Sequence, residues 1–147
     1  MLGALTLLGL EGCERYALDT KMALLCNKNG GIKVYETVEL SPTDFDAVTG
    51  YRGGGDWKNR ESFYGPNFRF VEKEEILVGT PDGPLSGRGR LSRHYSAIYR
   101  RSDNKLLGES IIYGRTGGDL FTFGMGPSSS VCPRLAVDLS QSVFKKG

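Results

Sequence analysis

Apolar residues near the start of the chain recur at helical intervals. Within residues 14–29 the intervals of three and four residues join Leu18, Met22, Leu25 and Cys26. Such spacing is typical of an amphipathic helix. Gly30 and Gly31 follow directly, and glycine commonly ends a helix because it accepts left-handed backbone conformations. The pattern therefore predicts one helix over residues 14–29.

Further along, apolar and polar residues alternate, as they do in a half-buried strand. Residues 32–40 show this alternation with one break near Glu36, which predicts a bulged strand. Residues 67–78 alternate around a charged centre. The clearest signal is a hairpin whose strands, residues 91–101 and 105–115, meet at a Ser-Asp-Asn turn.

Long connections separate these elements. The chain has 21 glycines in 147 residues, which favours short elements joined by generous loops. We expect loops over residues 43–67, 79–90 and 117–130. The pattern over residues 136–147 indicates neither helix nor strand, and a flexible tail is one interpretation of it. The sum is an α+β domain, with the N-terminal helix packed on a small antiparallel sheet of about four strands with long Gly-rich loops.

A charge-free apolar run, Leu2–Leu10, opens the chain. It is too short for a transmembrane helix, which needs about 20 residues, but it fits the apolar region of a secretory signal. Leu10-Glu11-Gly12-Cys13 follows and resembles the lipobox of bacterial envelope lipoproteins. Glu11 is larger and more charged than that motif usually allows, and no Lys or Arg precedes Cys13.

The resemblance implies that residues 1–12 are a signal-peptide remnant and that residues 13–147 form a single lipid-anchored domain. In that family the Cys sulfur, here that of Cys13, carries diacylglycerol and its new amine is acylated. The segment Gly30–Val38 also resembles uncharacterised proteobacterial lipoproteins, which implies no known activity. A start placed downstream of the true one would account for the missing basic residues.

Cysteine usage supports export. With Cys13 set aside for lipid, Cys26 and Cys132 remain, 106 residues apart, and exported proteins tend to pair their cysteines. We therefore predict a Cys26–Cys132 disulfide. The alternative is a cytosolic protein with three reduced, unrelated thiols.

Charge gives weaker guidance. The net charge of +2 predicts no attraction to nucleic acid or to a membrane surface through the field of the whole protein. Five arginines nevertheless lie close together in the sequence and are candidates for anion binding: Arg88, Arg90, Arg93, Arg100 and Arg101. A solvated, partly salt-bridged sheet face is the favoured explanation for them. If the domain faces the periplasm, lipid headgroups or glycans are the expected anions rather than nucleic acid.

Candidate chemistry is sparse. His94 is the single histidine, so a zinc site is not expected, and we predict no metal and no cofactor. A catalytic set could be drawn from His94, Asp119 and either Ser96 or Ser128, but no G-x-S-x-G motif supports it. Aromatic residues around residues 51–68 could line a groove or cover the sheet.

Three functions remain open. The first is a periplasm-facing, lipid-anchored accessory or binding module without enzymatic activity, whose partner is an envelope protein or glycan. The second is a small envelope hydrolase using His94. The third is a cytosolic RNA-associated protein using the Arg88–Arg101 cluster.

Overall fold

The computed structural model describes residues 11–50, 64–119 and 126–147 of the chain. Helix α1 (Glu11–Asn29) confirms the predicted helix and begins three residues earlier than expected. It buries Leu18, Met22 and Cys26, whereas Tyr16 and Leu24 face solvent. The helix ends at Gly30, where a Cβ atom would lie only 2.7 Å from the Cys26 carbonyl oxygen.

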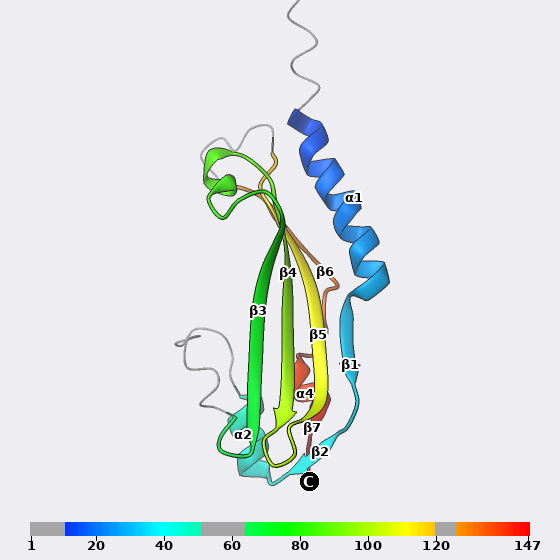
Figure 1. The fold of residues 1–147 in the computed structure, drawn as a ribbon, viewed down its shortest axis with the longest axis vertical. Helices are drawn as coiled ribbons and strands as arrows, with labels where there is room; N and C mark the ends of the chain where they lie inside the picture. The colour runs from blue at the N-terminus through cyan, green and yellow to red at the C-terminus, as the bar shows by residue number, and fades with distance from the viewer. Residues whose placement is uncertain (1–10, 51–63, 120–125) are drawn as a thin grey trace, which may run out of the picture. The chain divides into compact units, whose positions relative to one another are not determined.

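The main sheet has five strands, with β1 (Gly31–Val34), β5 (Lys105–Thr116), β4 (Arg90–Arg100) and β3 (Phe68–Val78) in that order, and β6 (Ser129–Cys132) also paired with β5. Both β1 and β6 run antiparallel to β5. Adjacent strands β4 and β5 confirm the predicted hairpin (Figure 1). The α+β fold class is therefore confirmed.

The single strand predicted over residues 32–40 is wrong, because the chain divides it between two sheets. The Tyr35 and Glu36 amides both donate to the Leu107 carbonyl, at 2.8 and 3.1 Å, and thus interrupt the ladder with β5. The next strand, β2 (Val38–Leu40), instead pairs in parallel with β7 (Phe144–Lys146).

Part of the loop predicted over residues 43–67 is also helical. Helix α2 (Pro42–Thr49) begins with proline in its first turn, and the Ser41 hydroxyl caps it by accepting from the Asp44 amide at 3.2 Å. Ser41-Pro42 is a helix-start signal in the sequence, since serine caps helices well and proline is tolerated in the first turn. Another short element, η2 (Gly83–Ser86), interrupts the loop predicted over residues 79–90.

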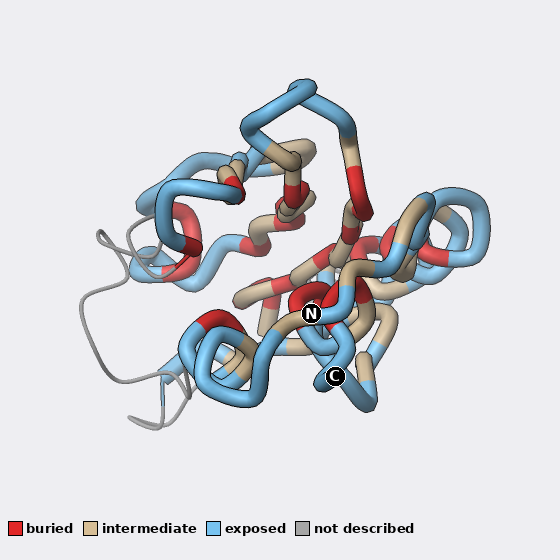
Figure 2. Tube along the Cα trace, turned by 90° about the horizontal axis from the view of Figure 1, so that it is seen from below, coloured by how far each residue is buried: buried red, intermediate tan, exposed pale blue. Residues whose placement is uncertain are grey.

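The chain divides into two compact units: residues 1–30, 74–94 and 112–134 form one, and residues 31–73, 95–111 and 135–147 form the other. Figure 2 shows buried, intermediate and exposed residues following one another along the chain trace. In the first unit α1 packs against β6. The aromatic and aliphatic core of the second unit includes Ile98, Leu107 and Phe144, none of which is exposed.

The end of the chain belongs to this second core. Helix α4 (Leu139–Val143) and β7 replace the flexible tail considered for residues 136–147. Val143 is fully buried, and the Phe144 ring meets Phe68 edge-on at 4.8 Å between centroids. A Cβ atom at Gly108 would lie 2.6 Å from the Val143 side chain, so the close approach of α4 to β5 depends on this glycine.

Candidate functional site

Cys26 and Cys132 form the predicted disulfide, which joins α1 to β6. Their Cα atoms are 5.9 Å apart, within the range that disulfide geometry requires. The backbone of Cys13 belongs to the first turn of α1. Residues 1–10, for which poor packing is expected, lie outside the described residues.

A buried arginine makes a second connection between α1 and the sheet. Arg115 on β5 is only 1% exposed, and its Nε donates to Asp19 on α1 at 2.7 Å. Its Nη1 donates to the Gly117 carbonyl at 3.0 Å and to the Ser128 hydroxyl at 2.7 Å. The guanidinium therefore ties the helix, the sheet and the segment around Ser128 together.

Asp119 completes this network. It accepts from the Ser128 amide at 2.8 Å and from the Ser128 hydroxyl at 2.7 Å. The hydroxyl bond, with the nearby charges of Arg115 and Arg15, lowers the pKa of Asp119. The Ser128–Asp119 pair considered for catalysis is thus engaged in holding the chain around Arg115.

His94 is close to a serine, but the arrangement is not that of a catalytic triad. Its Nε2 lies 3.1 Å from the Ser92 Oγ and 3.8 Å from a Glu74 carboxylate oxygen. In a triad the serine and the carboxylate contact different nitrogens of the ring. Ser92 is also only 4% exposed, which leaves little access for a substrate.

The five arginines of the predicted anion site have different surroundings. Arg90 donates to the Pro81 carbonyl at 3.2 Å, and Arg93 pairs with Glu75 at 3.6 Å. These two belong to the first compact unit, together with the exposed Arg88. Arg100 and Arg101 belong to the second unit. Anion binding by the five stays a prediction.

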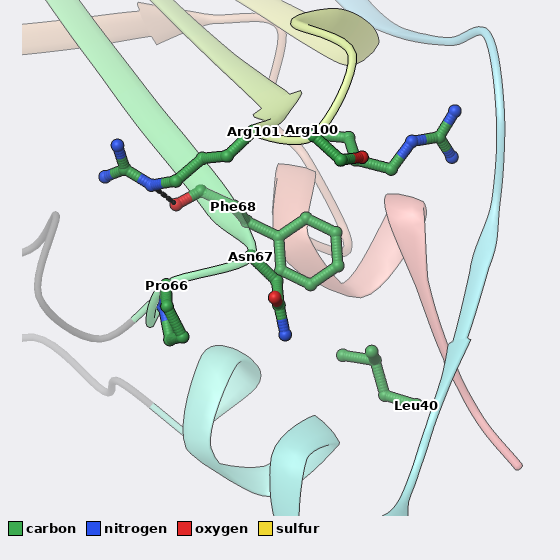
Figure 3. A pocket seen from close by; sticks show the side chains of 7 residues that line it. Leu40, Pro66, Asn67, Phe68, Arg100 and Arg101 are labelled. Carbon is green, nitrogen blue, oxygen red and sulfur yellow. Dashed lines mark hydrogen bonds between the residues drawn. The ribbon is translucent and has the colours of Figure 1, made fainter.

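Arg100 and Arg101 border an open pocket of about 500 Å³, which is lined by Leu40, Pro66, Asn67, Phe68, Arg100, Arg101 and Ser102. Figure 3 shows the two guanidinium groups directed to opposite sides. Arg101 donates through Nε to the Phe68 carbonyl at 2.8 Å, and Arg100 is bound by Glu36 and Asp103. The chain's own acceptors therefore engage both arginines.

The sequence analysis does not predict a cluster of aromatic and charged side chains that lie on or beside the strands of the second unit. The Glu109 carboxylate accepts from the Tyr35 hydroxyl at 2.7 Å and from the Tyr95 hydroxyl at 3.1 Å. Arg69 places its guanidinium 4.6 Å from the centre of the Tyr99 ring. We call these five residues the tyrosine cluster.

Electrostatics within the tyrosine cluster keep the hydroxyls of Tyr35 and Tyr95 protonated. Burial and hydrogen bonds to Glu109 and Tyr99 raise the pKa of Tyr95. The hydrogen bond to Glu109 also raises the pKa of Tyr35. These two tyrosines therefore present neutral rings at physiological pH. The strand register that unites them gives no local signal in the sequence.

The groove suggested by the aromatic-rich segment has no support in its described part, since Tyr64 and Phe68 are buried in the core. Its remaining aromatic residues lie outside the described residues.

Among the described residues, no three or more His, Cys, Asp or Glu side chains gather in a way that could hold a metal ion. The helices within the described ranges include none with the length and apolar character needed to cross a membrane.

Comparison of the whole chain with protein-family models, with curated proteins and with solved structures finds no match. The lipoprotein resemblance of Leu10–Cys13 therefore stays a prediction.

Proposed function

We propose that this chain is a lipid-anchored cell-envelope protein that faces the periplasm and acts as a non-enzymatic accessory or binding module. The observation that carries the proposal is the Cys26–Cys132 disulfide, because disulfides persist in oxidising compartments and are rare in the cytosol. Export also explains the apolar run before Cys13.

The position of Cys13 suits an anchor. Asp19 lies six positions further along the helix, which corresponds to a rise of about 9 Å. Asp19 in turn is bonded to the buried Arg115 of the sheet. An acyl group on Cys13 would thus hold the first compact unit near the bilayer, with no flexible linker between them.

The surroundings of His94 favour a binding role over hydrolysis. A general base needs a reachable reaction partner, and its neighbour Ser92 is buried. The carboxylate of Glu74 approaches the same ring nitrogen as Ser92, so it does not orient the ring as the carboxylate of a catalytic triad does.

Intact-mass spectrometry of the native protein tests the proposal. We expect a chain that begins at Cys13, carries the mass of diacylglycerol and an amide-linked acyl group, and lacks two hydrogens because of the disulfide. Cys13→Ser is the matched control, and it should abolish acylation while the disulfide persists.

A folded native protein with unmodified Cys13 would refute the anchor. Free thiols at Cys26 and Cys132 in protein trapped with an alkylating agent before lysis would refute export. That second result, together with recovery in the cytosolic fraction bound to RNA, would favour the Arg88–Arg101 hypothesis instead.

A further inference from the structure

We propose that the tyrosine cluster (Tyr35, Arg69, Tyr95, Tyr99 and Glu109) binds an acidic saccharide, meaning a glycan whose sugar rings carry carboxylates. The inference rests on the proposed function, since export would bring the cluster to the glycans of the cell envelope. It names the ligand class of the binding module.

The rings of the tyrosine cluster are held before any ligand arrives. The hydroxyls of Tyr35 and Tyr95 share the Glu109 carboxylate. Tyr35 is nevertheless 56% exposed, so part of its surface is open to contact. A fixed aromatic surface binds with little loss of side-chain entropy, which is why tyrosine is frequent in recognition sites. The C–H face of a sugar ring is a suitable partner for such a surface.

Arg69 supplies a positioned positive charge. It lies over Tyr99 and donates to the Asn104 side chain at 2.8 Å, so two contacts orient the guanidinium. Within the described part of the chain, no carboxylate oxygen lies within 4.0 Å of its nitrogens. A planar guanidinium binds a carboxylate through two parallel hydrogen bonds. The cluster therefore has a donor pair for one carboxylate.

The remaining charges favour a saccharide over other anions. Glu109 accepts two hydroxyls but has room for about four hydrogen bonds, so it can also accept from a sugar hydroxyl. Lys33 stands opposite Glu109 in the β1–β5 register and can donate to a sugar oxygen. A neutral glycan would leave Arg69 without a carboxylate.

Titration calorimetry with the purified, disulfide-bonded protein tests the inference. The probes are trigalacturonate, the uncharged cellotriose and dextran sulfate. We expect trigalacturonate to bind at least about tenfold more tightly than cellotriose, because only the former engages Arg69 by charge-assisted bonds. Arg69→Gln should remove this preference, and Arg69→Lys should retain only part of it because lysine lacks the paired donors.

Arg134→Gln is the matched control, because it removes an exposed arginine outside the cluster and outside the five candidate anion-binding arginines. Each variant must unfold at the same urea concentration as the original chain. If Arg69→Gln does not, Tyr99→Leu is the second test. Equal binding of cellotriose, no binding of trigalacturonate, or equal weakening by Arg134→Gln would overturn the inference. So would a preference for dextran sulfate that both arginine variants reduce alike. Because the assay needs no acylation, its failure would leave the lipid anchor untouched. Binding of trigalacturonate together with an unmodified Cys13 in the native protein would refute the anchor alone.

Discussion

Arg115 offers the sharpest test of how α1 is held on the sheet. Replacement by methionine keeps a long side chain but removes every donor of the guanidinium. Asp19 and the Gly117 carbonyl lose their Arg115 hydrogen bonds, whereas Ser128 keeps Asp119 as a partner. The cost therefore comes from the helix contact and from one buried carbonyl.

The magnitude follows from these two losses. A buried carbonyl without a donor costs about 1–3 kcal/mol. Asp19 is about a third exposed, so water replaces much of its lost hydrogen bond and we assign it only about 1 kcal/mol. Methionine regains part of the total by burying apolar surface. We therefore expect Arg115→Met to lower the free energy of unfolding by about 2–3 kcal/mol.

Arg15→Met is the matched control. Arg15 also contacts Asp19, at 3.8 Å, and it contacts Asp119 at 3.3 Å, but its side chain is 55% exposed. Exposed ion pairs contribute about 0–1 kcal/mol, so this variant should change little. Urea unfolding with the disulfide intact measures both, provided that the slope with denaturant stays constant. Equal, small losses for the two variants would refute the structural role of Arg115.

Three further results are expected. Gly108→Ala should lower the free energy of unfolding by about 1–3 kcal/mol, because the new Cβ would meet the Val143 side chain at 2.6 Å. Gly114→Ala, whose Cβ would have its nearest neighbour at 3.7 Å, should be tolerated, and thermal melts of both variants measure the difference. Replacing both cysteines of the disulfide by alanine should cost roughly 4–5 kcal/mol in urea, as the chain-entropy model gives for a loop of this length, and a loss below about 1 kcal/mol would contradict it. Hydrogen bonds from Arg100, and to a smaller extent from Lys105, lower the pKa of Glu36 in the folded protein. The stability that ionised Glu36 contributes is therefore fully present above the pKa of Glu36 in the unfolded chain, and it is lost as the pH falls through the lower pKa of the folded state. Unfolding midpoints measured from pH 7 to pH 2 should accordingly fall less steeply in Glu36→Gln, and parallel profiles would contradict the assignment.

Helix α1 and the β4–β5 hairpin could be predicted from local sequence patterns, because the spacing of their own apolar residues shows which side is buried. Helix α1 buries positions 18, 22 and 26, as its spacing indicates. The hairpin combines alternating strands with a turn in which Asn104 adopts a positive φ of 54°, a conformation that asparagine tolerates well. In both cases the residues that define the element also decide which side is buried.

Elements that depend on distant partners could not be predicted in this way. Helix α4 has five residues, too few to show helical periodicity, and β7 is ordered by parallel pairing with β2, about a hundred positions earlier in the chain. The tyrosine cluster is similar, because Tyr35, Arg69, Tyr99 and Glu109 lie on or beside different strands. Only the strand order and register bring them together.

Helix α1 is connected to the sheet by an ion pair and by a disulfide, and only the disulfide can be broken by reduction. This difference matters for the proposed anchor at Cys13. Asp19 and Cys26 lie seven residues apart, two turns along the helix and therefore on the same face. One is held by an ion pair to Arg115 and the other by a covalent bond to Cys132. Reduction would remove the covalent connection but leave the ion pair, which is the one nearer to Cys13. The N-terminal half of α1 would thus stay fixed to the sheet through Arg115, so a lipid on Cys13 would keep its short, defined path to the domain in either redox state.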